Sequence, residues 1–494
     1  MHLRPGSPIP SDYAAARAWM RRGSLAEAML PGGPGLAVRA GDSELSHEEL
    51  AAHAAQLAGG LLAEGVRPRD RVALFAARSL QWILAYLALI RLGAVAIPVN
   101  PAYTERELGL ILEDAGPRAI ICDSARRHLV AAATEGRGRP PAVLDLAQLQ
   151  PEAAAPWPKA GPDAAALIVY TSGTTGRPKG AVLDAGNVLA QARGVVEAWR
   201  WEARDRLVHA LPLFHIHGLL MGLTGTLLAQ ASLELVEWSP ASVVSALEGG
   251  ASMFFGVPAM YERLVSHLDR EPADLSRVRL FVSGSAPLAP ALFQRCVERL
   301  GQPPLERYGL TEGGIIVSNP YAGPRRAGRV GYPLPGVELE LADGGEILVR
   351  GGQVFSGYLH EAGGTGLRLA DGWLHTQDVG ELDADGSLAI RGRLRDLIIS
   401  GGYNVHPREV ELILEQHPMV REVAVAGVPS ERWGEEVRAY VVSRGPVTQA
   451  ELMEHCRGQL APYKCPRQVH FIEELPRNSM GKVMRSALAD LAST

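Results

Sequence analysis

Tyr170-Thr-Ser-Gly-Thr-Thr-Gly-Arg-Pro-Lys-Gly180 is a loop of glycines and hydroxyl side chains that directly follows the apolar run 164–169. Its glycines let the backbone turn sharply and bring N–H groups against an anion, and the hydroxyls add further donors. A Walker phosphate loop has Lys and then Ser or Thr after its last Gly, whereas Lys179 is followed by Gly180. The segment therefore predicts a phosphate-binding loop of another kind, with a plain solvated turn as the alternative.

Length and charge limit the function classes. At 494 residues the chain exceeds what one hydrophobic core usually serves, so we expect two or more domains. The net charge is −5 and no Lys/Arg cluster occupies one contiguous segment, so nucleic acid is not an expected partner. The four cysteines are scattered without metal-ligand spacing, which suits a reducing cytoplasm; they are Cys122, Cys296, Cys456 and Cys465.

The N-terminus lacks the apolar core of a signal peptide. Two apolar runs, 82–99 and 218–231, are interrupted by Arg, Gly, Thr or Gln and fall short of the roughly 20 residues that a membrane span requires. We therefore expect buried helices and strands there, no membrane span, and a cytoplasmic monomer or homodimer.

Helices and short apolar strands alternate before the loop, which predicts parallel α/β layers covered on both faces. Ser46 and Glu49 form a capping-box pattern for the first helix. The expected strands are 71–76, 94–99, 119–122 and 165–169, the expected helices are 82–91 and 105–115, and 140–162 is expected to be a surface connection.

Beyond the loop the same alternation continues, with a helix over 187–199 that Asn187 caps, strands at 207–211, 252–256 and 280–283, and a helix at 258–267. Short Gly-rich segments from Arg326 on, including 337–341 and 346–349, predict an antiparallel, barrel-like part. We place the domain boundary after residue 394. Residues 1–394 form the large α/β domain, and residues 395–494 form a small, mobile α+β domain with helices at 407–417 and 448–459 and strands at 423–428 and 437–442.

Five further motifs follow the loop in order: Tyr308-Gly-Leu-Thr-Glu312, Trp373–Asp378, Gly392–Ile399, Ser400-Gly-Gly-Tyr-Asn404 and Asn478-Ser-Met-Gly-Lys482. With them the chain resembles the adenylate-forming superfamily, which comprises acyl-CoA synthetases, peptide-synthetase adenylation domains and luciferases. The resemblance extends from about residue 45 onward. It implies two steps: a carboxylate attacks the α-phosphate of ATP to form an acyl-adenylate and pyrophosphate, and a thiol then displaces AMP.

The resemblance also implies an ATP site. Tyr308 would stack on adenine, Asp378 and Arg393 would hold the ribose, and Thr311 would bond the α-phosphate. Glu312 and Thr174 would hold Mg²⁺, and Lys482 would bridge the carboxylate and the α-phosphate as the catalytic lysine. The remaining ATP-binding residues are Thr171, Ser172, Gly173, Thr175, Gly176, Lys179, Ser285 and Gly309. For Asp378 and Arg393 the alternative is a mutual surface ion pair.

By the same resemblance the small domain swings between two poses about a hinge at Arg395. Gly401 and Gly402 would then line the tunnel for the pantetheine arm, and Trp433 would lie near the CoA nucleotide, with plain packing as the alternative for this Trp. Because no carrier domain follows Lys482, free coenzyme A is the expected thiol.

Two arginines bear on the choice of acid. Arg307, just before the adenine tyrosine, would be costly to bury without an anion. Together with Arg263 it resembles malonyl-CoA synthetases, in which two arginines clamp the second carboxylate of malonate or methylmalonate, a task for which forked guanidinium groups are suited. His215 would act at the junction of the acyl and nucleotide pockets, and Ser283 is a further expected substrate-binding residue.

The alternatives for these side chains point to other substrates or roles. If Arg307 pairs with Glu306 or another carboxylate and Arg263 lies on a solvated helix face, the acid would be a medium-chain or aromatic monocarboxylate. His215 and His217 form an H-x-H pair that we interpret as packing or gating, because no third zinc ligand lies nearby in the sequence.

Three positions depart from the superfamily pattern. Asp184-Ala-Gly-Asn187 lacks the usual His, Gln377 replaces a common Gly, and Cys465 replaces a basic residue near the CoA phosphates. Functions of other classes also remain open: a nucleotide or acyl-adenylate binder without turnover, or an NTPase. An NTPase would release ADP and phosphate, whereas a ligase releases AMP and pyrophosphate.

Overall fold

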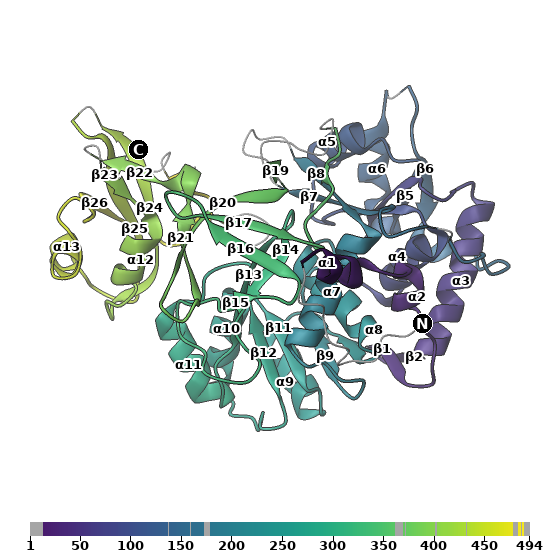
Figure 1. Cartoon of the computed structure of the whole chain (residues 1–494), viewed down its shortest axis with the longest axis horizontal. Helices are drawn as coiled ribbons and strands as arrows, with labels where there is room; N and C mark the ends of the chain where they lie inside the picture. The colour runs from purple at the N-terminus through teal and green to yellow at the C-terminus, as the bar shows by residue number, and fades with distance from the viewer. Residues whose placement is uncertain are drawn as a thin grey trace.

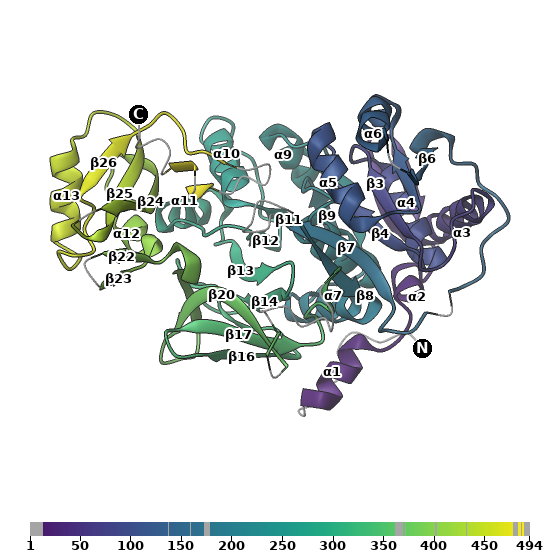
Figure 2. The same cartoon turned by 90° about the horizontal axis from the view of Figure 1, so that it is seen from above.

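The computed structural model describes residues 13–136, 138–158, 160–171, 178–360, 369–370, 372–400, 403–430, 432–477, 483–485 and 487–488. Two large mixed sheets form the N-terminal part. A smaller antiparallel sheet follows, and the C-terminal part lies beyond it at the end of the molecule opposite β3–β6 (Figures 1 and 2). The predicted α/β architecture with a small α+β C-terminal part is confirmed.

The first sheet carries the predicted phosphate loop. Its seven strands run in the order β18-β8-β7-β4-β3-β5-β6, and the pairings among β3–β7 are parallel. β7 and β8 pair antiparallel, so the loop that joins them closes a hairpin rather than a strand-to-helix turn. The bounds are β3 (Arg71–Phe75), β4 (Val95–Pro98), β5 (Ala119–Cys122), β6 (Ala142–Asp145), β7 (Ala165–Thr171), β8 (Lys179–Asp184) and β18 (Gly357–Tyr358).

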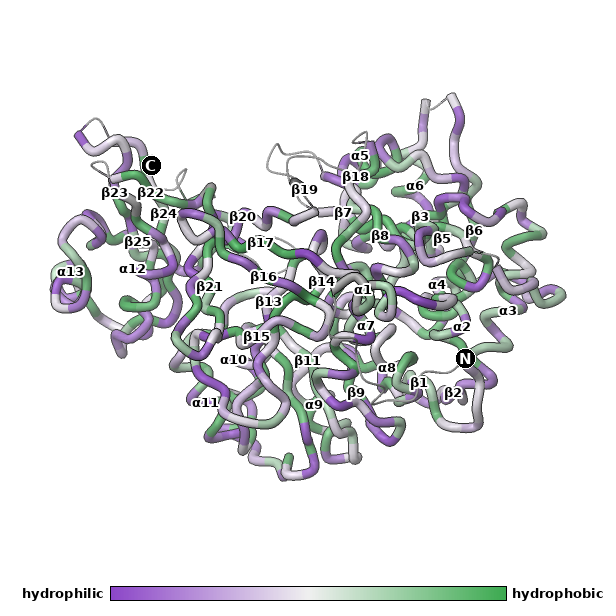
Figure 3. The backbone as a smooth tube through the Cα atoms, viewed as in Figure 1, coloured by the Kyte–Doolittle hydropathy of each residue, from purple (hydrophilic) through white to green (hydrophobic). Residues whose placement is uncertain are grey.

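Helices cover both faces of this sheet because its strands are apolar on both sides. Val72 and Leu74 of β3 pack with α3 (His47–Ala63) and α4 (Leu80–Leu92), and Ala73 and Phe75 pack with α5 (Glu105–Ala115) and α6 (Arg127–Thr134). Figure 3 shows the apolar stretches along these strands and the helices against them. β6 lies inside the segment predicted as a surface connection, so that prediction is wrong for residues 142–145.

The second sheet carries most of the candidate site. It has nine strands in the order β15-β14-β13-β12-β11-β9-β10-β1-β2, parallel from β1 to β13 and antiparallel at both edges. Its bounds are β1 (Leu36–Ala40), β2 (Ser43–Ser46), β9 (Arg206–His209), β10 (Ser232–Leu235), β11 (Met253–Gly256), β12 (Leu280–Ser283), β13 (Leu305–Leu310), β14 (Gly314–Ser318) and β15 (Tyr332–Pro333). The helices after β10, β11 and β12 are α9 (Pro240–Glu248), α10 (Pro258–Leu268) and α11 (Pro290–Leu300).

Helix α7 (Ala185–Ala198) contacts strands of both sheets and so joins them. It begins two residues earlier than predicted, because Asp184 rather than Asn187 is its N-cap. The Asp184 side chain accepts from Asn187 N at 2.7 Å, and the Asn187 side chain accepts from Asp184 N at 3.0 Å. The segment Asp184-Ala-Gly-Asn187, which lacks the usual His, thus closes a capping box.

A buried arginine fastens the N-terminal helix α1 (Tyr13–Arg21) to this joint. Arg21 donates from Nη2 to Asp163 at 2.6 Å and to Asp184 at 3.0 Å, and from Nη1 to the Gly352 carbonyl at 3.2 Å. Burial alone would lower the pKa of Arg21, but the hydrogen bond and charge of Asp184 raise it above its ordinary value. One cation therefore holds three distant segments together.

The antiparallel sheet contains β16 (Val337–Leu341), β17 (Glu346–Gly351), β19 (Leu369–Ala370), β20 (Trp373–Leu382) and β21 (Leu388–Arg393). The C-terminal part has β22 (Ile398–Ser400), β23 (Tyr403–Val405), β24 (Val420–Ser430), β25 (Gly434–Ser443) and β26 (Gln468–Phe471), with α12 (Pro407–Leu414) and α13 (Gln449–Arg457). In the part of the chain that the structure describes, no helix is long and apolar enough to cross a membrane. The boundary after residue 394 stays a prediction.

Candidate active site

Tyr308, Asp378 and Arg393 lie together where β13 approaches the antiparallel sheet. The Tyr308 hydroxyl donates to Asp378 Oδ2 at 2.7 Å, and Arg393 Nε lies 2.8 Å from Asp378 Oδ1. Asp378 and Arg393 are also cross-strand partners of β20 and β21. They therefore do form the ion pair of the alternative interpretation, in which the Asp378 side chain is 5% exposed and the Arg393 side chain is 40% exposed.

Gln377, beside Asp378, has a left-handed backbone with φ of 62°. This conformation suits glycine, which the superfamily resemblance leads us to expect at this position. Both the backbone N–H and the side-chain amide of Gln377 donate to Glu346 Oε1, at 3.0 and 2.9 Å. These two bonds offset the strain of a side chain in this conformation.

Glu312, Tyr358 and Lys179 form a second group. Glu312 is 6% exposed and follows β13, Tyr358 lies on β18, and Lys179 begins β8 at the end of the phosphate loop. The Tyr358 hydroxyl donates to Glu312 Oε1 at 2.5 Å. The Lys179 ammonium lies 4.8 Å from the centroid of the Tyr358 ring.

A third group surrounds Arg307. Its Nη2 donates to the Ser285 hydroxyl at 3.4 Å, and that hydroxyl also lies 3.2 Å from Nδ1 of His217. A Cβ on Gly284 would overlap the Arg307 guanidinium, so a larger residue there would force the guanidinium to move. Ser285 has φ of 69°, a strained conformation that occurs often at functional sites.

Burial governs the electrostatics of this group. It lowers the pKa of Arg307 to about 9, and it is the largest cause of the strong lowering of the pKa of His217, to which the charge of Arg307 adds. His217 is therefore neutral near pH 7, and Arg307 is a buried cation. Among the described residues no carboxylate pairs with Arg307, and its Nε has no hydrogen-bond partner.

Glu306 lies on the other side of β13. Its Oε1 accepts from the Leu288 N–H at 3.0 Å, and burial raises the pKa of this carboxyl to about 7. The alternative in which Arg307 pairs with Glu306 does not hold among the described residues, because successive side chains of a strand face opposite ways.

The other predicted substrate residues differ in how they relate to this group. Arg263, on α10, is exposed, and its guanidinium lies 5.6 Å from the ring centroid of Trp238 rather than beside Arg307. His215 is half-buried and borders the group, since its Nδ1 accepts from the His217 N–H at 3.3 Å. Ser283 is fully buried at the end of β12, and its hydroxyl lacks a partner among the described residues.

Sequence reasoning missed His217 as a neighbour of Arg307. It begins a π-helix (His217–Thr224), a helix type that often marks functional sites. Its ring also stacks on Phe255 at 6.4 Å. The H-x-H spacing drew attention to it, but only the fold places it against Ser285.

In the C-terminal part, two arginines flank Trp433. The guanidinium carbons of Arg467 and Arg432 lie 4.0 and 4.8 Å from its ring centroid. Cys465 is buried, with its sulfur 3.7 Å from the Ala461 carbonyl. Arg467, two residues later, carries a positive charge.

Several predicted residues lie outside the described part of the chain. They are Ser172, Gly173, Thr174, Thr175, Gly176, Gly401, Gly402 and Lys482, and the side chain of Arg395. Of the remaining ATP-site residues, Thr171 ends β7 opposite Lys179, Gly309 lies in β13, and Thr311 is buried beside Glu312.

The described residues contain no group of three or more His, Cys, Asp or Glu side chains that could hold a metal by itself. A single buried carboxylate, Glu312, beside a phosphate loop suits Mg²⁺, which is commonly bound by one or two carboxylates together with substrate phosphates and water. The residues present therefore fit the magnesium ion that the superfamily resemblance implies.

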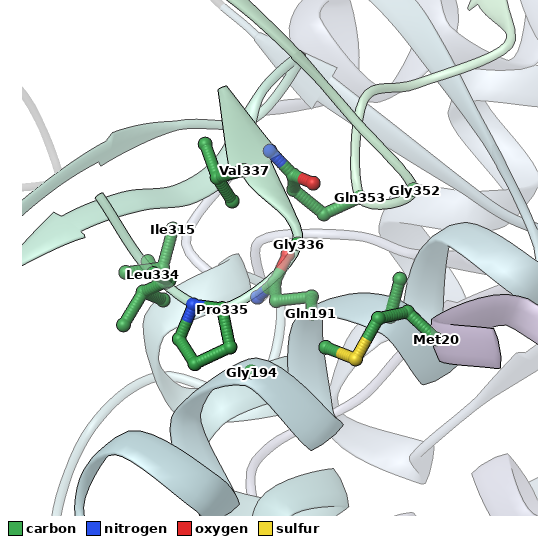
Figure 4. Close-up of a pocket in the computed structure, with 11 residues that line it drawn as sticks. Met20, Gln191, Gly194, Ile315, Leu334, Pro335, Gly336, Val337, Gly352 and Gln353 are labelled. Atoms are coloured by element: carbon green, nitrogen blue, oxygen red, sulfur yellow. The ribbon is translucent and has the colours of Figure 1, made fainter. Parts of the chain in front are cut away.

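A small hollow elsewhere is lined by Met20 of α1, Gln191 and Gly194 of α7, and residues of the 334–337 turn (Figure 4). Its lining shares no residue with the three groups. It marks the packing of α1 and α7 rather than the candidate site.

The chain is similar to known proteins in sequence and fold. The AMP-binding enzyme family matches residues 32–359, and the AMP-binding enzyme C-terminal domain matches residues 409–482. The chain therefore belongs to the adenylate-forming superfamily of AMP-binding enzymes. Within it, the chain is an AMP-forming acyl-CoA ligase.

Individual relatives differ in substrate. A feruloyl-CoA synthase from Amycolatopsis sp is 36% identical over 467 residues, 91% of this chain and 94% of that protein. The mitochondrial malonate–CoA ligase of Bos taurus is 34% identical over 484 residues, 86% of this chain and 82% of that protein. The crystal structure of ATP-bound MatB from Rhodopseudomonas palustris matches with a TM-score of 0.89 at 36% identity, over 95% of this chain and 98% of that one.

Proposed function

We propose that this acid–CoA ligase acts on a small dicarboxylate, malonate or methylmalonate. The observation that carries the proposal is Arg307, a buried guanidinium that no carboxylate pairs with among the described residues. A buried cation without a counter-ion is costly, and an anionic substrate group would remove much of that cost. The bovine malonate–CoA ligase supports the proposal at 34% identity.

The pocket chemistry fits one carboxylate of such a substrate. The planar guanidinium can donate two parallel hydrogen bonds to a carboxylate. Ser285 and neutral His217 lie beside it and can exchange further hydrogen bonds. The other carboxylate of the substrate would remain for adenylation.

In the first step, that carboxylate attacks the α-phosphate of ATP and displaces pyrophosphate. Tyr308 would stack on adenine, Asp378 and Arg393 would hold the ribose, and Thr311 would bond the α-phosphate. Lys179 and the phosphate loop would hold the departing pyrophosphate. Mg²⁺, held by Glu312 and Thr174, would offset the charge of the phosphates.

Lys482 is proposed to bridge the attacking carboxylate and the α-phosphate, since two anions repel as they approach. In the second step CoA attacks the acyl-adenylate and releases AMP. Residues 395–494, turning about Arg395, would carry Gly401 and Gly402 to the pantetheine arm. The guanidinium groups of Arg432 and Arg467, which lie over the Trp433 ring, offer positive charge for the CoA nucleotide.

A second candidate is an aromatic monocarboxylate. His217 stacks on Phe255, which also makes edge contacts with Trp199 at 5.4 Å and Trp201 at 5.6 Å, so an aromatic cluster adjoins the proposed acyl pocket. The feruloyl-CoA synthase relative, at 36% identity, favours this candidate. Against it, a neutral ring would leave Arg307 without a counter-ion.

Pyrophosphate release decides between the two candidates. The enzyme with ATP, Mg²⁺ and CoA is offered malonate, methylmalonate, acetate, octanoate, benzoate and ferulate, and AMP is confirmed as the other product. Preference for malonate or methylmalonate supports the proposal. Preference for ferulate or benzoate selects the second candidate, and ADP as the product would overturn ligase chemistry altogether.

A further inference from the structure

Tyr358 lies between two of the proposed ATP-site residues. Its short strand β18 pairs antiparallel with β8, with Tyr358 opposite Ala181, two residues beyond Lys179. The side chain is 9% exposed and packs edge-on against Phe355, with ring centroids 5.0 Å apart. The fold therefore fixes the Tyr358 ring beside the end of the phosphate loop.

The ring and the hydroxyl of Tyr358 contact opposite charges. The Lys179 ammonium lies 4.8 Å from the ring centroid, and the hydroxyl donates to Glu312 Oε1 at 2.5 Å. Tyr358 thus contacts both the proposed phosphate ligand and the proposed metal ligand. The three residues come from β8, β18 and the turn after β13, so only the folded chain brings them together.

We propose that Tyr358 is a positioning residue for adenylation, which holds Glu312 towards the metal and Lys179 towards the phosphates of ATP. The inference rests on the proposed roles of Lys179 and Glu312. One side chain would thus fix both the orientation of the Glu312 carboxylate and the position of the Lys179 ammonium.

The physical reasons lie in the two contacts. A charge-assisted hydrogen bond to one carboxylate oxygen fixes the carboxylate plane, so the other oxygen keeps a constant direction. The negative face of the ring attracts the ammonium and limits the sweep of the flexible lysine stem. Loss of the hydroxyl should therefore weaken the binding of Mg²⁺, and loss of the ring should also weaken the binding of the ATP phosphates.

Two substitutions separate the contacts. Tyr358→Phe removes the hydroxyl but keeps the ring, and Tyr358→Leu removes both. Tyr440→Phe is the matched control, because Tyr440 is fully buried in the C-terminal part and its hydroxyl has no hydrogen-bond partner among the described residues.

Equilibrium binding of ATP is measured by calorimetry, without metal and across a MgCl₂ series. Tyr358→Phe is expected to raise the half-saturating MgCl₂ concentration roughly ten-fold, because hydrogen bonds to charged groups contribute about that factor, while metal-free ATP binding stays unchanged. Tyr358→Leu is expected to weaken ATP binding in both conditions. Tyr440→Phe is expected to change neither.

A merely structural role predicts a different pattern. Then Tyr358→Phe would lower the melting temperature and leave the MgCl₂ dependence unchanged, which overturns the inference. A double-mutant cycle gives a second test, since Tyr358→Phe should have no further effect on the MgCl₂ dependence of a protein that already carries Glu312→Gln. Additive effects would also overturn it.

The binding assay also keeps this inference apart from the proposed function. If wild-type protein binds ATP with Mg²⁺ but releases pyrophosphate with none of the acids, the proposed function fails. Measurements of ATP binding across the MgCl₂ series still test the role of Tyr358 in that case. If pyrophosphate is released and the MgCl₂ dependence of Tyr358→Phe equals that of wild type, only the inference about Tyr358 fails.

Discussion

Glu306 and Arg307 are neighbours in β13, yet their side chains lie on opposite sides of the strand. Arg307 donates to Ser285 in the proposed acyl pocket at 3.4 Å, whereas Glu306 accepts from the Leu288 N–H at 3.0 Å. The alternation of a β-strand separates the two charges. Arg307 therefore remains available to a substrate anion. The Glu306 carboxyl, whose pKa burial raises to about 7, instead gains or loses a proton near neutral pH.

Arg307→Leu is expected to lower kcat/KM for malonate by roughly 100-fold or more, because a charge-assisted pair with a buried cation is lost. ATP binding is expected to stay intact. Steady-state kinetics with malonate and acetate, with calorimetry for ATP, measure both effects.

Arg91→Leu is a control for the loss of a buried arginine, since Arg91 stacks on Trp157 and donates to the Pro156 carbonyl at 2.6 Å, outside the site. Its ratio of malonate to acetate activity should match wild type. Equal losses for malonate and acetate in Arg307→Leu would argue against a dicarboxylate substrate. A selective loss of malonate activity in Arg263→Leu would support the hypothesis that Arg263 and Arg307 together bind the second carboxylate of malonate.

Glu306→Gln is expected to change the pH dependence of stability. Burial raises the pKa of Glu306 in the folded protein to about 7 from 4.5, so the folded state holds its proton more tightly than the unfolded chain. Wild-type stability should therefore fall as pH rises from about 4.5 to about 7, by roughly 1–3 kcal/mol from this group. Glu306→Gln should lack that part of the fall and be the more stable protein at pH 8.

Chemical denaturation of both proteins between pH 4.5 and pH 8 measures the difference. Parallel curves would show that Glu306 titrates alike in the folded and unfolded states. The pKa assignment would then be wrong, although the position of the side chain would not be affected.

Trp433→Ala is expected to raise KM for CoA roughly ten-fold, because the ring that holds Arg432 and Arg467 in place is lost. ATP–pyrophosphate exchange, which does not need CoA, should be unchanged. Trp157→Ala is the matched control, since Arg91 stacks on that ring at 3.7 Å. An unchanged KM for CoA would assign Trp433 to packing.

Lys482→Ala is expected to slow adenylation by about 10²–10³, the usual cost of removing one preorganised charge from a transition state. Thioester formation from a preformed acyl-adenylate and CoA should retain most of its rate. The two half-reactions are measured separately by quenched assays. Equal losses in both would indicate that Lys482 serves the fold or the second step instead.

The sequence predicted most of the architecture because its signals are local. The capping box of Ser46 and Glu49 is present as predicted, and the strand 119–122 has the predicted bounds. Long-range packing explains the failures. Asn187 looked like a helix cap, but Asp184 occupies that place, held by Arg21 from far away in the sequence.

The candidate site was predicted in part for the same reason. Motif residues such as Tyr308 and Asp378 could be read from the sequence, and the structure brings them within hydrogen-bond distance. The neighbours of Arg307 could not be predicted from the sequence. His217 and Ser285 lie on elements other than that of Arg307, and neither belongs to a contiguous motif with it. Tyr358 was missed in the same way.

The bonds of Arg21 have a practical consequence for anyone who shortens this protein. A version that starts after residue 21 would keep every superfamily motif, yet it would leave the Asp184 carboxylate buried without the cation that now meets it at 3.0 Å. The cap of α7 and the attachment of the Gly352 turn would weaken together. Trimming that looks harmless in an alignment would therefore loosen the joint between the two large sheets.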